Sequence, residues 1–202
     1  MVLSIISVLL TGYLLGSVSA SVLISKYCYK KDVREAGSGN AGATNMARTF
    51  GIISGLVTLL CDVVKTVLAC LFGRMLLGNW GLFFAGVSCM AGHCYPLFFH
   101  FKGGKGVSVG TAIAALLGWK VFLFAVIVFF LPATLSKRVS VGSLVTAALL
   151  PVWAVVFGCS LPLQLLAAVT AVAVIYRHIP NIKRLLKGEE PQFRAGKQRA
   201  KD

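Results

Sequence analysis

Acidic residues are scarce in this sequence: Asp and Glu together number six in 202 residues. Charged residues of both signs make up 13% of the chain, against about 25% in a typical soluble domain. So few charges cannot cover a water-exposed surface of this size, which excludes an ordinary soluble domain. Hydrophobic residues make up 57% of the chain, and the mean hydropathy is +0.85. We therefore predict an all-α integral membrane protein.

Paired cysteine motifs and metal-ligand patterns are also missing. The six cysteines include no C-x-x-C pair, and the three histidines are not arranged with cysteines at a recurrent ligand spacing. Most of the cysteines lie in apolar runs, where Cys acts as a small hydrophobic residue. We expect free thiols, no bound metal and no cofactor.

Positive charge is the one abundant kind of charge. The formal net charge is +14, but the Lys and Arg residues lie in loops between apolar runs and not along an exposed helix face with interleaved aromatics. This distribution disfavours nucleic acid as a partner. It favours anionic membrane lipids and phosphorylated substrates.

Seven apolar stretches predict seven transmembrane helices, some of them short. A spanning helix needs roughly 20 apolar residues. The fourth and fifth stretches are shorter, and they form either one long tilted helix or, as the charge pattern favours, a tight hairpin with its break at 118–120. The first stretch lacks the basic start and the A-x-A site of a signal peptide, so we read it as a retained span. The stretches cover residues 2–25, 51–73, 82–101, 107–119, 121–136, 139–158 and 162–178.

Basic residues alternate between successive loops and indicate the orientation. The first, third and fifth loops and the C-terminal tail hold most of the Lys and Arg, whereas the second and fourth hold only Arg74 and Lys120. Because basic loops stay on the cytoplasmic side, we expect the N-terminus outside and the C-terminus in the cytoplasm. No repeat or linker divides the chain, which predicts a single domain over residues 1–202 with a frayed polar tail at 196–202.

The first polar segment reads Gly37-Ser-Gly-Asn-Ala-Gly-Ala-Thr-Asn-Met-Ala-Arg48. Its glycines let the backbone turn sharply and point amides and hydroxyls inward, with a guanidinium behind them, which suits a phosphate group. The segment formally matches G-x-G-x-x-G, but no strand precedes it, so a dinucleotide-binding fold is rejected. A flexible connector is the alternative. The candidate ligands are Gly37, Ser38, Gly39, Asn40, Thr44, Asn45 and Arg48.

The second polar segment reads His93-Cys-Tyr-Pro-Leu-Phe-Phe-His-Phe-Lys-Gly-Gly-Lys-Gly106. Glycines around two lysines allow backbone amides and an ammonium group to converge on an oxyanion. The pattern is not a Walker A loop, because no Ser or Thr follows the lysine of a G-x-x-x-x-G-K motif. The alternative is a membrane anchor with a glycine turn. The candidate substrate-binding residues are His93, Lys102, Gly103, Gly104, Lys105 and Gly106.

The third polar segment, 177–190, follows the last apolar stretch and reads Arg-His-Ile-Pro-Asn-Ile-Lys-Arg-Leu-Leu-Lys-Gly-Glu-Glu. His178 is the most plausible titrating group, since histidine exchanges a proton near neutral pH. The alternative is an interfacial basic helix. The charge alternation predicts that all three polar segments lie on the cytoplasmic side.

Two charged residues fall inside an apolar stretch. Asp62 and Lys65 are three residues apart on one helix face and can pair. Charges at that depth are costly and are usually functional or buried in the bundle. We interpret the pair as structural support for the site.

The three segments together resemble the bacterial glycerol-3-phosphate acyltransferase family that uses acyl phosphate. Members carry GSGNxGATNxxR, HxxPxxxxFKGGKG and RHxxNIxRLxxGxE segments, and this chain has GSGNAGATNMAR, HCYPLFFHFKGGKG and RHIPNIKRLLKGEE in that order. The resemblance implies seven helices with the motif loops facing the cytoplasm. It departs at His100, where a small residue is usual, and at residues 107–110.

The resemblance also implies roles for single residues. Ser38 and Arg48 would be essential for activity, and Gly103, Gly104 and Gly106 would help to bind glycerol 3-phosphate. The G-x-E spacing of the third motif favours Glu190 over Glu189. The implied catalytic residues are Ser38, Arg48, His178, Asn181 and Glu190, and Arg177, Arg138, Ser140 and Ser143 would shape the substrate site.

We therefore expect an enzyme of the bacterial inner membrane that transfers a fatty acyl group from acyl phosphate to the 1-hydroxyl of glycerol 3-phosphate. The products are 1-acylglycerol 3-phosphate and phosphate. The general base is His178, His93 or a substrate phosphate. None of the three histidines starts the H-x-x-x-x-D motif of acyltransferases that use CoA or a carrier protein. The alternatives are a small anion transporter, for which an internal repeat is lacking, and a structural scaffold.

Overall fold

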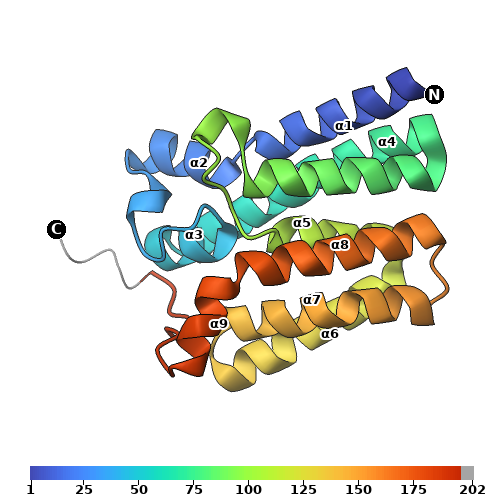
Figure 1. Cartoon of the computed structure of the whole chain (residues 1–202). Coiled ribbons are helices and arrows are strands. Elements are labelled where there is room, and N and C mark those ends of the chain that lie inside the picture. Colours follow the sequence, from blue (N-terminus) through green and yellow to red (C-terminus); the bar gives the residue numbers. More distant parts are fainter. Residues whose placement is uncertain (197–202) are drawn as a thin grey trace.

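The chain folds as a bundle of helices in the computed structural model, which describes residues 1–196 (Figure 1). Residues 197–202, on which nearly all of the expected polar tail falls, lie outside the described residues. All regular elements of the described part are helical, so the prediction of an all-α protein is confirmed. They are α1 (Val2–Ser17), α2 (Ala20–Tyr29), η1 (Val33–Glu35), α3 (Ala43–Phe50), α4 (Ile52–Cys94), η2 (Leu97–Phe99), α5 (Val107–Leu117), α6 (Trp119–Ser136), α7 (Val139–Val156), α8 (Leu161–Arg177) and α9 (Ile179–Leu186).

The first apolar stretch, expected as one span, is one candidate membrane span, Val2–Tyr29, and a break divides it into two helices. α1 ends at Ser17, and Val18 and Ser19 are extended before α2 begins. The break frees backbone carbonyls that need donors in an apolar setting. The Lys65 ammonium of α4 donates to the carbonyl oxygens of Gly16 at 3.0 Å and Val18 at 2.6 Å. The intramembrane lysine therefore stabilises the break.

Helix α4 consists of two arms that double back on each other (Figure 1). The helix is interrupted at Leu77 and Gly78, where Gly78 has φ 59°. A side chain on Gly81 would overlap the carbonyl of Gly73, so the arms need small residues to pack this closely. The sequence predicted a loop between the stretches that end at residue 73 and begin at residue 82, and the reversal at Leu77 and Gly78 falls within it, although Arg74 itself is helical. The left-handed conformation at residue 78 is open to glycine at little cost.

The predicted break between the fourth and fifth stretches is confirmed. α5 ends at Leu117 and α6 begins at Trp119, with Gly118 at φ 140° between them. By length and composition, four segments of the described residues can cross a membrane, and a fifth is added if α8 and α9, which meet at a 56° bend, form one span. α5 is shorter than these segments. Seven crossings and the orientation of the termini stay predictions.

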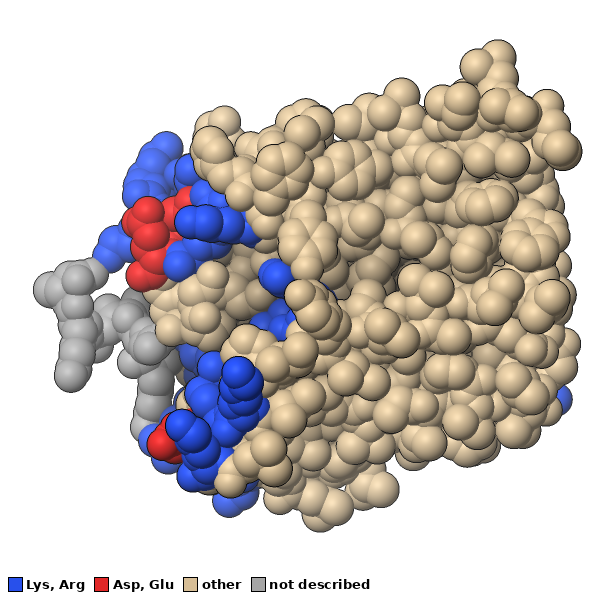
Figure 2. Space-filling model, in the orientation of Figure 1, with Lys and Arg blue, Asp and Glu red and all other residues tan. Residues whose placement is uncertain are grey.

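Charge and apolar surface are separated along the long axis of the bundle. Lys, Arg, Asp and Glu gather at the end where α2, α3 and α9 lie, and the rest of the visible surface is almost free of them (Figure 2). Large side chains such as Leu135 (78% exposed) and Phe130 (58%) cover the helix exteriors. Such an apolar exterior matches a lipid environment. All three polar segments lie at the charged end.

Candidate active site

A cavity of about 960 Å³ lies between the three polar segments and helices α5 to α8. One part of it is polar and is lined by Ser38, Arg48, His93, Lys105 and His178. The other part runs between α5, α6 and α7 and is apolar, lined by Phe122, Ala125, Val126, Phe129, Ala147 and Leu150. A ligand with an anionic head and a hydrocarbon chain fits such a cavity.

The first segment forms a turn that Asn45 holds together from its place on α3. The Asn45 amide nitrogen donates to the carbonyls of Val33 and Ala36, both at 2.9 Å. Its amide oxygen accepts a hydrogen bond from the Ser38 backbone N–H at 2.8 Å. Gly37 and Gly39 have φ 60° and 70° and allow the turn. Asn45 therefore positions Ser38 at the cavity instead of offering its own amide to a ligand.

The glycines of the second segment serve close packing. Side chains on Gly103 or Gly104 would overlap atoms of His93, and Gly106 has φ 82°. The Gly104 N–H donates to the His93 carbonyl at 3.0 Å. Gly103 and Gly104 are buried and are not among the cavity-lining residues. The geometry thus gives these glycines the task of presenting the neighbouring Lys105 to the cavity.

Arg177 supports the same loop from α8. Its guanidinium donates to the carbonyls of Gly104 at 3.2 Å and Gly103 at 3.4 Å, and it lies 5.1 Å from the ring centroid of Tyr95. Arg177 is absent from the cavity lining, as is the exposed Lys102. Both had been expected to bind substrate, and the structure places them behind or outside the loop.

Glu190 joins the third segment to α7 and α9. Its carboxylate accepts hydrogen bonds from Ser140 Oγ, Asn181 Nδ2 and Arg184 Nε, each at 2.7 Å. Burial alone would raise the pKa of Glu190, but these three donors outweigh burial and lower it. The Glu190 carbonyl also accepts from Arg138 Nε at 2.8 Å. The buried position supports the choice of Glu190 over the exposed Glu189.

Lys105 is connected to this network but keeps its ammonium at the cavity. It donates to the Asn181 amide oxygen at 2.6 Å. Burial lowers the pKa of Lys105 to about 8, Glu190 opposes the shift, and the guanidinium groups of Arg184, Arg48 and Arg177 add to it. Crowded cations of this kind are stabilised by a bound anion.

His178, directly after α8, is buried and lines the cavity. Its Nδ1 lies 2.8 Å from the Val174 carbonyl oxygen. Because a carbonyl can only accept, Nδ1 carries the proton in the neutral ring. Nε2 is then the basic nitrogen.

The intramembrane pair of α4 extends to His93. Lys65 Nζ lies 2.8 Å from Asp62 Oδ1, and His93 Nδ1 lies 3.4 Å from Lys65 Nζ and 3.7 Å from Asp62 Oδ1. All three side chains are buried. The cluster fixes the base of the glycine loop and the break after α1, in line with the predicted supporting role. Among residues 1–196, no group of three or more His, Cys, Asp or Glu residues is arranged to hold a metal ion.

Most of the predicted site residues meet at the cavity. Arg184, which binds Glu190 and lines the cavity, was not predicted, although its opposite charge six residues before Glu190 was a usable signal. The predicted residues that do not line the cavity are Gly39, Lys102, Gly103, Gly104, Gly106, Arg138 and Arg177. Those that line it are Gly37, Ser38, Asn40, Thr44, Asn45, Arg48, His93, Lys105, Ser140, Ser143, His178, Asn181 and Glu190.

Comparison with known proteins decides the family. The sequence model described as glycerol-3-phosphate acyltransferase matches residues 6–188. The chain belongs to this family. A glycerol-3-phosphate acyltransferase of Shouchella clausii is 41% identical over 197 residues, covering 94% of this chain and 96% of the relative. One of Synechococcus sp. strain CC9902 is 38% identical over 194 residues, covering 96% and 97%.

Solved structures of the family have the same fold. The crystal structure of PlsY (YgiH), an integral membrane glycerol 3-phosphate acyltransferase, in its glycerol 3-phosphate form matches with a TM-score of 0.89 and 34% identity, covering 95% of this chain and 96% of that one. Its lysophosphatidic acid form matches with a TM-score of 0.87 and 33% identity, with the same coverage. The family resemblance drawn from the three motifs is therefore confirmed, and the chain is an integral membrane protein.

Proposed function

We propose that this protein transfers a fatty acyl group from acyl phosphate to the 1-hydroxyl of glycerol 3-phosphate, in phospholipid synthesis. The products are 1-acylglycerol 3-phosphate (lysophosphatidic acid) and inorganic phosphate. The names of the family members support the acceptor. The two similar crystal structures are described as glycerol 3-phosphate and lysophosphatidic acid forms, which correspond to the acceptor and the product of this reaction.

The observation that carries the proposal is the two-part cavity. Arg48 and Lys105 line its polar part. Its apolar part is lined by enough hydrophobic side chains to take a hydrocarbon tail. Glycerol 3-phosphate has no tail, so the apolar part belongs to the acyl donor. The polar part then holds the phosphate groups of both substrates.

The reaction is direct transfer in this proposal. The 1-hydroxyl oxygen attacks the acyl carbonyl carbon, the carbonyl–phosphate C–O bond breaks, and the hydroxyl proton passes to His178 Nε2. Ser38 and Arg48 hydrogen-bond the oxygens on which negative charge develops. Cations between two phosphate groups offset their repulsion and orient the reactants. Because phosphate is a good leaving group, a modest base suffices and no acyl-enzyme is needed.

His178 is a better candidate base than His93. His93 Nδ1 faces the Asp62–Lys65 pair, and its Nε2 lies against Gly104. His178 has its Nδ1 on a backbone carbonyl, and its Nε2 forms no hydrogen bond to residues 1–196. A substrate phosphate is the remaining alternative.

The expected place of the reaction is the cytoplasmic face of the bacterial inner membrane. All three motif segments lie at the end of the bundle that holds α2, α3 and α9 (Figure 1), where the charged residues gather (Figure 2). The alternation of basic residues between loops favours a cytoplasmic position for that end. Membrane lipids surround the remaining apolar surface.

Donor choice can be tested with purified protein, glycerol 3-phosphate and either palmitoyl phosphate or palmitoyl-CoA. We expect lysophosphatidic acid and phosphate from palmitoyl phosphate only, with the activity lost in Ser38→Ala. Turnover with palmitoyl-CoA alone would contradict the proposed donor. Turnover with neither donor would contradict the proposed reaction.

A further inference from the structure

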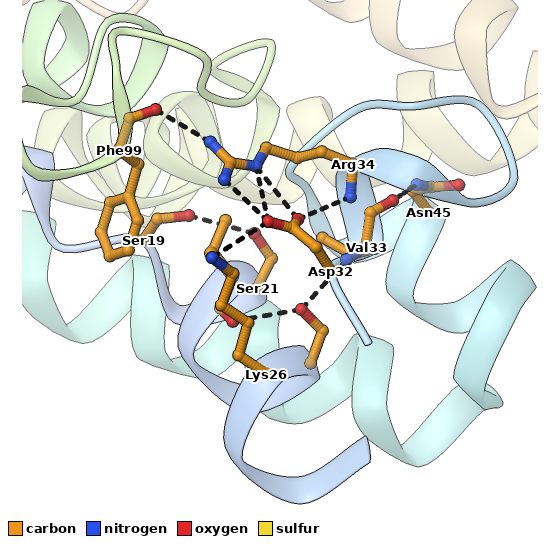
Figure 3. Close-up of polar contacts among 10 residues, drawn as sticks. Ser19, Ser21, Lys26, Asp32, Val33, Arg34, Asn45 and Phe99 are labelled. Atoms are coloured by element: carbon orange, nitrogen blue, oxygen red, sulfur yellow. Dashed lines mark hydrogen bonds and ion pairs between the residues drawn. The ribbon is translucent and has the colours of Figure 1, made fainter. Parts of the chain in front are cut away.

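A charged cluster outside the three motifs joins the first and second polar segments (Figure 3). Arg34, on the η1 turn, donates from Nε to Asp32 Oδ1 at 3.0 Å and from Nη2 to Asp32 Oδ2 at 2.7 Å. Its third nitrogen, Nη1, donates to the backbone carbonyl of Phe99 at 2.8 Å. Arg34 is therefore bound to the carboxylate of Asp32, at the start of the η1 turn, and to the second polar segment through the Phe99 carbonyl.

Asp32 holds Arg34 rigidly. Its Oδ1 also accepts the Arg34 backbone N–H at 3.0 Å and so closes the η1 turn. The hydrogen bond from the Arg34 side chain lowers the pKa of Asp32 to about 2, so the carboxylate stays charged. The two side chains are largely buried, with 9% of the Asp32 side-chain surface and 16% of the Arg34 side-chain surface exposed. Lys26 adds an outer contact to Asp32 at 3.3 Å.

The η1 turn is tied to the position of Ser38. Val33 is fully buried, and its N–H donates to Ser25 Oγ at 3.1 Å. Its carbonyl accepts from the amide nitrogen of Asn45, the side chain that also binds the Ser38 backbone. A shift of the η1 turn would therefore move Ser38.

On the other side, Phe99 begins the turn that leads into the glycine loop. The next two residues, His100 and Phe101, have φ 56° and 58°, a left-handed conformation that is costly for residues other than glycine. Phe101 N–H donates to the Pro96 carbonyl at 3.0 Å and Lys102 N–H to the Phe99 carbonyl at 3.3 Å. Such a turn persists only where its surroundings hold it, and Arg34 bonds the carbonyl at its start.

We propose that Arg34, held by Asp32, is a positioning residue that fixes the glycine loop relative to the Ser38 turn, and thereby sets the distance between Lys105 and Arg48 for binding glycerol 3-phosphate. The inference rests on the proposed function for the identity of the ligand. Glycerol 3-phosphate is small and is held only by the polar part of the cavity, so its affinity depends on both loops. The acyl donor is also anchored by its chain and depends less on them.

Kinetics of three variants test this role. We expect Arg34→Gln and Arg34→Lys to raise the KM for glycerol 3-phosphate about tenfold, with the KM for acyl phosphate changed less than about threefold. Lysine keeps the charge but cannot bond a carboxylate with two nitrogens and a carbonyl with a third. Lys26→Gln is the matched control: it removes a positive charge beside Asp32, keeps the Arg34–Phe99 bond, and should stay within about twofold of the wild type. A fraction of misfolded enzyme would lower kcat without moving KM. If the KM for glycerol 3-phosphate in Arg34→Gln and Arg34→Lys equals that in Lys26→Gln, the inference is overturned.

Amide hydrogen exchange tests the same role without turnover. In Arg34→Gln, residues 97–106 should exchange faster than in the wild type and in Lys26→Gln, while exchange in α7 stays unchanged. Unchanged exchange in residues 97–106 would overturn the inference. If the wild-type protein turns over acyl phosphate and Arg34→Gln has no effect on KM or exchange, the positioning role alone fails. If the wild type has no such activity but the exchange result holds, the proposed function fails and the coupling of the two loops stands.

Discussion

Arg48 is a partly buried cation: among residues 1–196 its guanidinium forms no ion pair, and it lines the cavity within electrostatic reach of both Glu190 and Arg184. A phosphate or a developing oxyanion would supply a direct ion-pair partner for the guanidinium. We expect Arg48→Gln to lower kcat/KM at least ~100-fold, equivalent to about 2.7 kcal/mol of transition-state stabilisation. The thermal unfolding temperature should change little, since the substitution breaks no ion pair of this guanidinium.

The matched control is Arg74→Gln, which removes an exposed arginine of α4. Its activity should stay within about twofold of the wild type, as usual for a surface charge. Steady-state kinetics of both variants at saturating acyl phosphate provide the comparison. If Arg48→Gln is as active as Arg74→Gln, the anion-binding role of Arg48 is wrong.

The lowered pKa of Lys105 predicts that kcat/KM for glycerol 3-phosphate depends on pH. Its pKa is lowered to about 8, so the protonated, anion-binding form is lost as the pH rises through that value. We expect kcat/KM for glycerol 3-phosphate to fall about tenfold per pH unit above about pH 8, because kcat/KM reports the free enzyme. Lys105→Arg keeps its charge at all these pH values and should have a flat profile there. A wild-type profile that stays flat to about pH 9.5 contradicts this role.

At the scale of elements, Glu190 holds α7, α9 and the segment after α9 together through three side-chain donors. We expect Glu190→Gln to lower the free energy of unfolding by about 1.5 to 3 kcal/mol, the usual worth of a hydrogen bond to a charged group. Glu189→Gln, which changes the exposed neighbouring carboxylate, should have little effect on stability. Thermal unfolding of both variants in detergent gives the comparison, and equal stabilities would contradict the account.

The sign of the pH effect follows from the lowered pKa of Glu190. The stabilisation is present above the pKa that Glu190 has in the unfolded chain, and it is lost as the pH falls through the lowered folded value. The difference in stability between wild type and Glu190→Gln should therefore shrink on acidification. A difference that grows on acidification would contradict the charged state assigned to Glu190.

Helix α6 lines the apolar part of the cavity. Its position predicts that the rate of transfer depends on the length of the donor's acyl chain. Val126 faces the cavity roughly 16 Å along the helix from the charged end, at 1.5 Å per residue. We expect Val126→Phe to slow transfer from long-chain acyl phosphates at least about fivefold while short-chain donors are unaffected, since only long chains reach this depth. Leu135→Phe, on the lipid-exposed surface, is the control. Competition between donors of two lengths measures the ratio, and an unchanged ratio in Val126→Phe would rule out this path for the chain.

The sequence predicts those helix breaks that local residues cause, and it does not predict those that depend on residues far apart in the chain. The break at Gly118 was predictable, because a glycine between two apolar runs acts locally. The break after α1 was not, because it is stabilised by Lys65, far along the chain in α4. The reversal of α4 at Gly78 falls within the predicted loop between residues 73 and 82, because this glycine also acts locally.

The same distinction applies to the site. The gathering of three polar segments at one end followed from the alternation of charge, and the cavity brings most of their residues together. The packing role of the glycines did not follow: Gly103 and Gly104 make room for His93, while their expected part in substrate binding stays a prediction. Which residue a loop glycine packs against depends on how the loop folds back, here onto the end of α4, and the local sequence does not reveal it. The Arg34–Phe99 bond was missed for the same reason.

At the scale of the whole molecule, the separation of charge in Figure 2 predicts the orientation in the membrane. Cys28 is exposed on α2, at the charged end, whereas Cys61 is exposed on α4 among apolar residues. We expect a membrane-impermeant maleimide to label Cys28 in inside-out vesicles and not in right-side-out ones, because basic loops face the cytoplasm. Cys61, facing lipid, should stay unlabelled in both. Labelling of Cys28 in right-side-out vesicles only would reverse the proposed orientation.

The central claim is that both phosphates are held in one cavity and that the acyl group passes directly between the substrates. Rapid measurement of phosphate release from acyl phosphate, with and without glycerol 3-phosphate, tests it most directly. The account predicts phosphate release only when glycerol 3-phosphate is present, in equal amount to the lysophosphatidic acid formed. A burst of phosphate equal to the enzyme concentration in the absence of glycerol 3-phosphate would reveal an acyl-enzyme and contradict direct transfer.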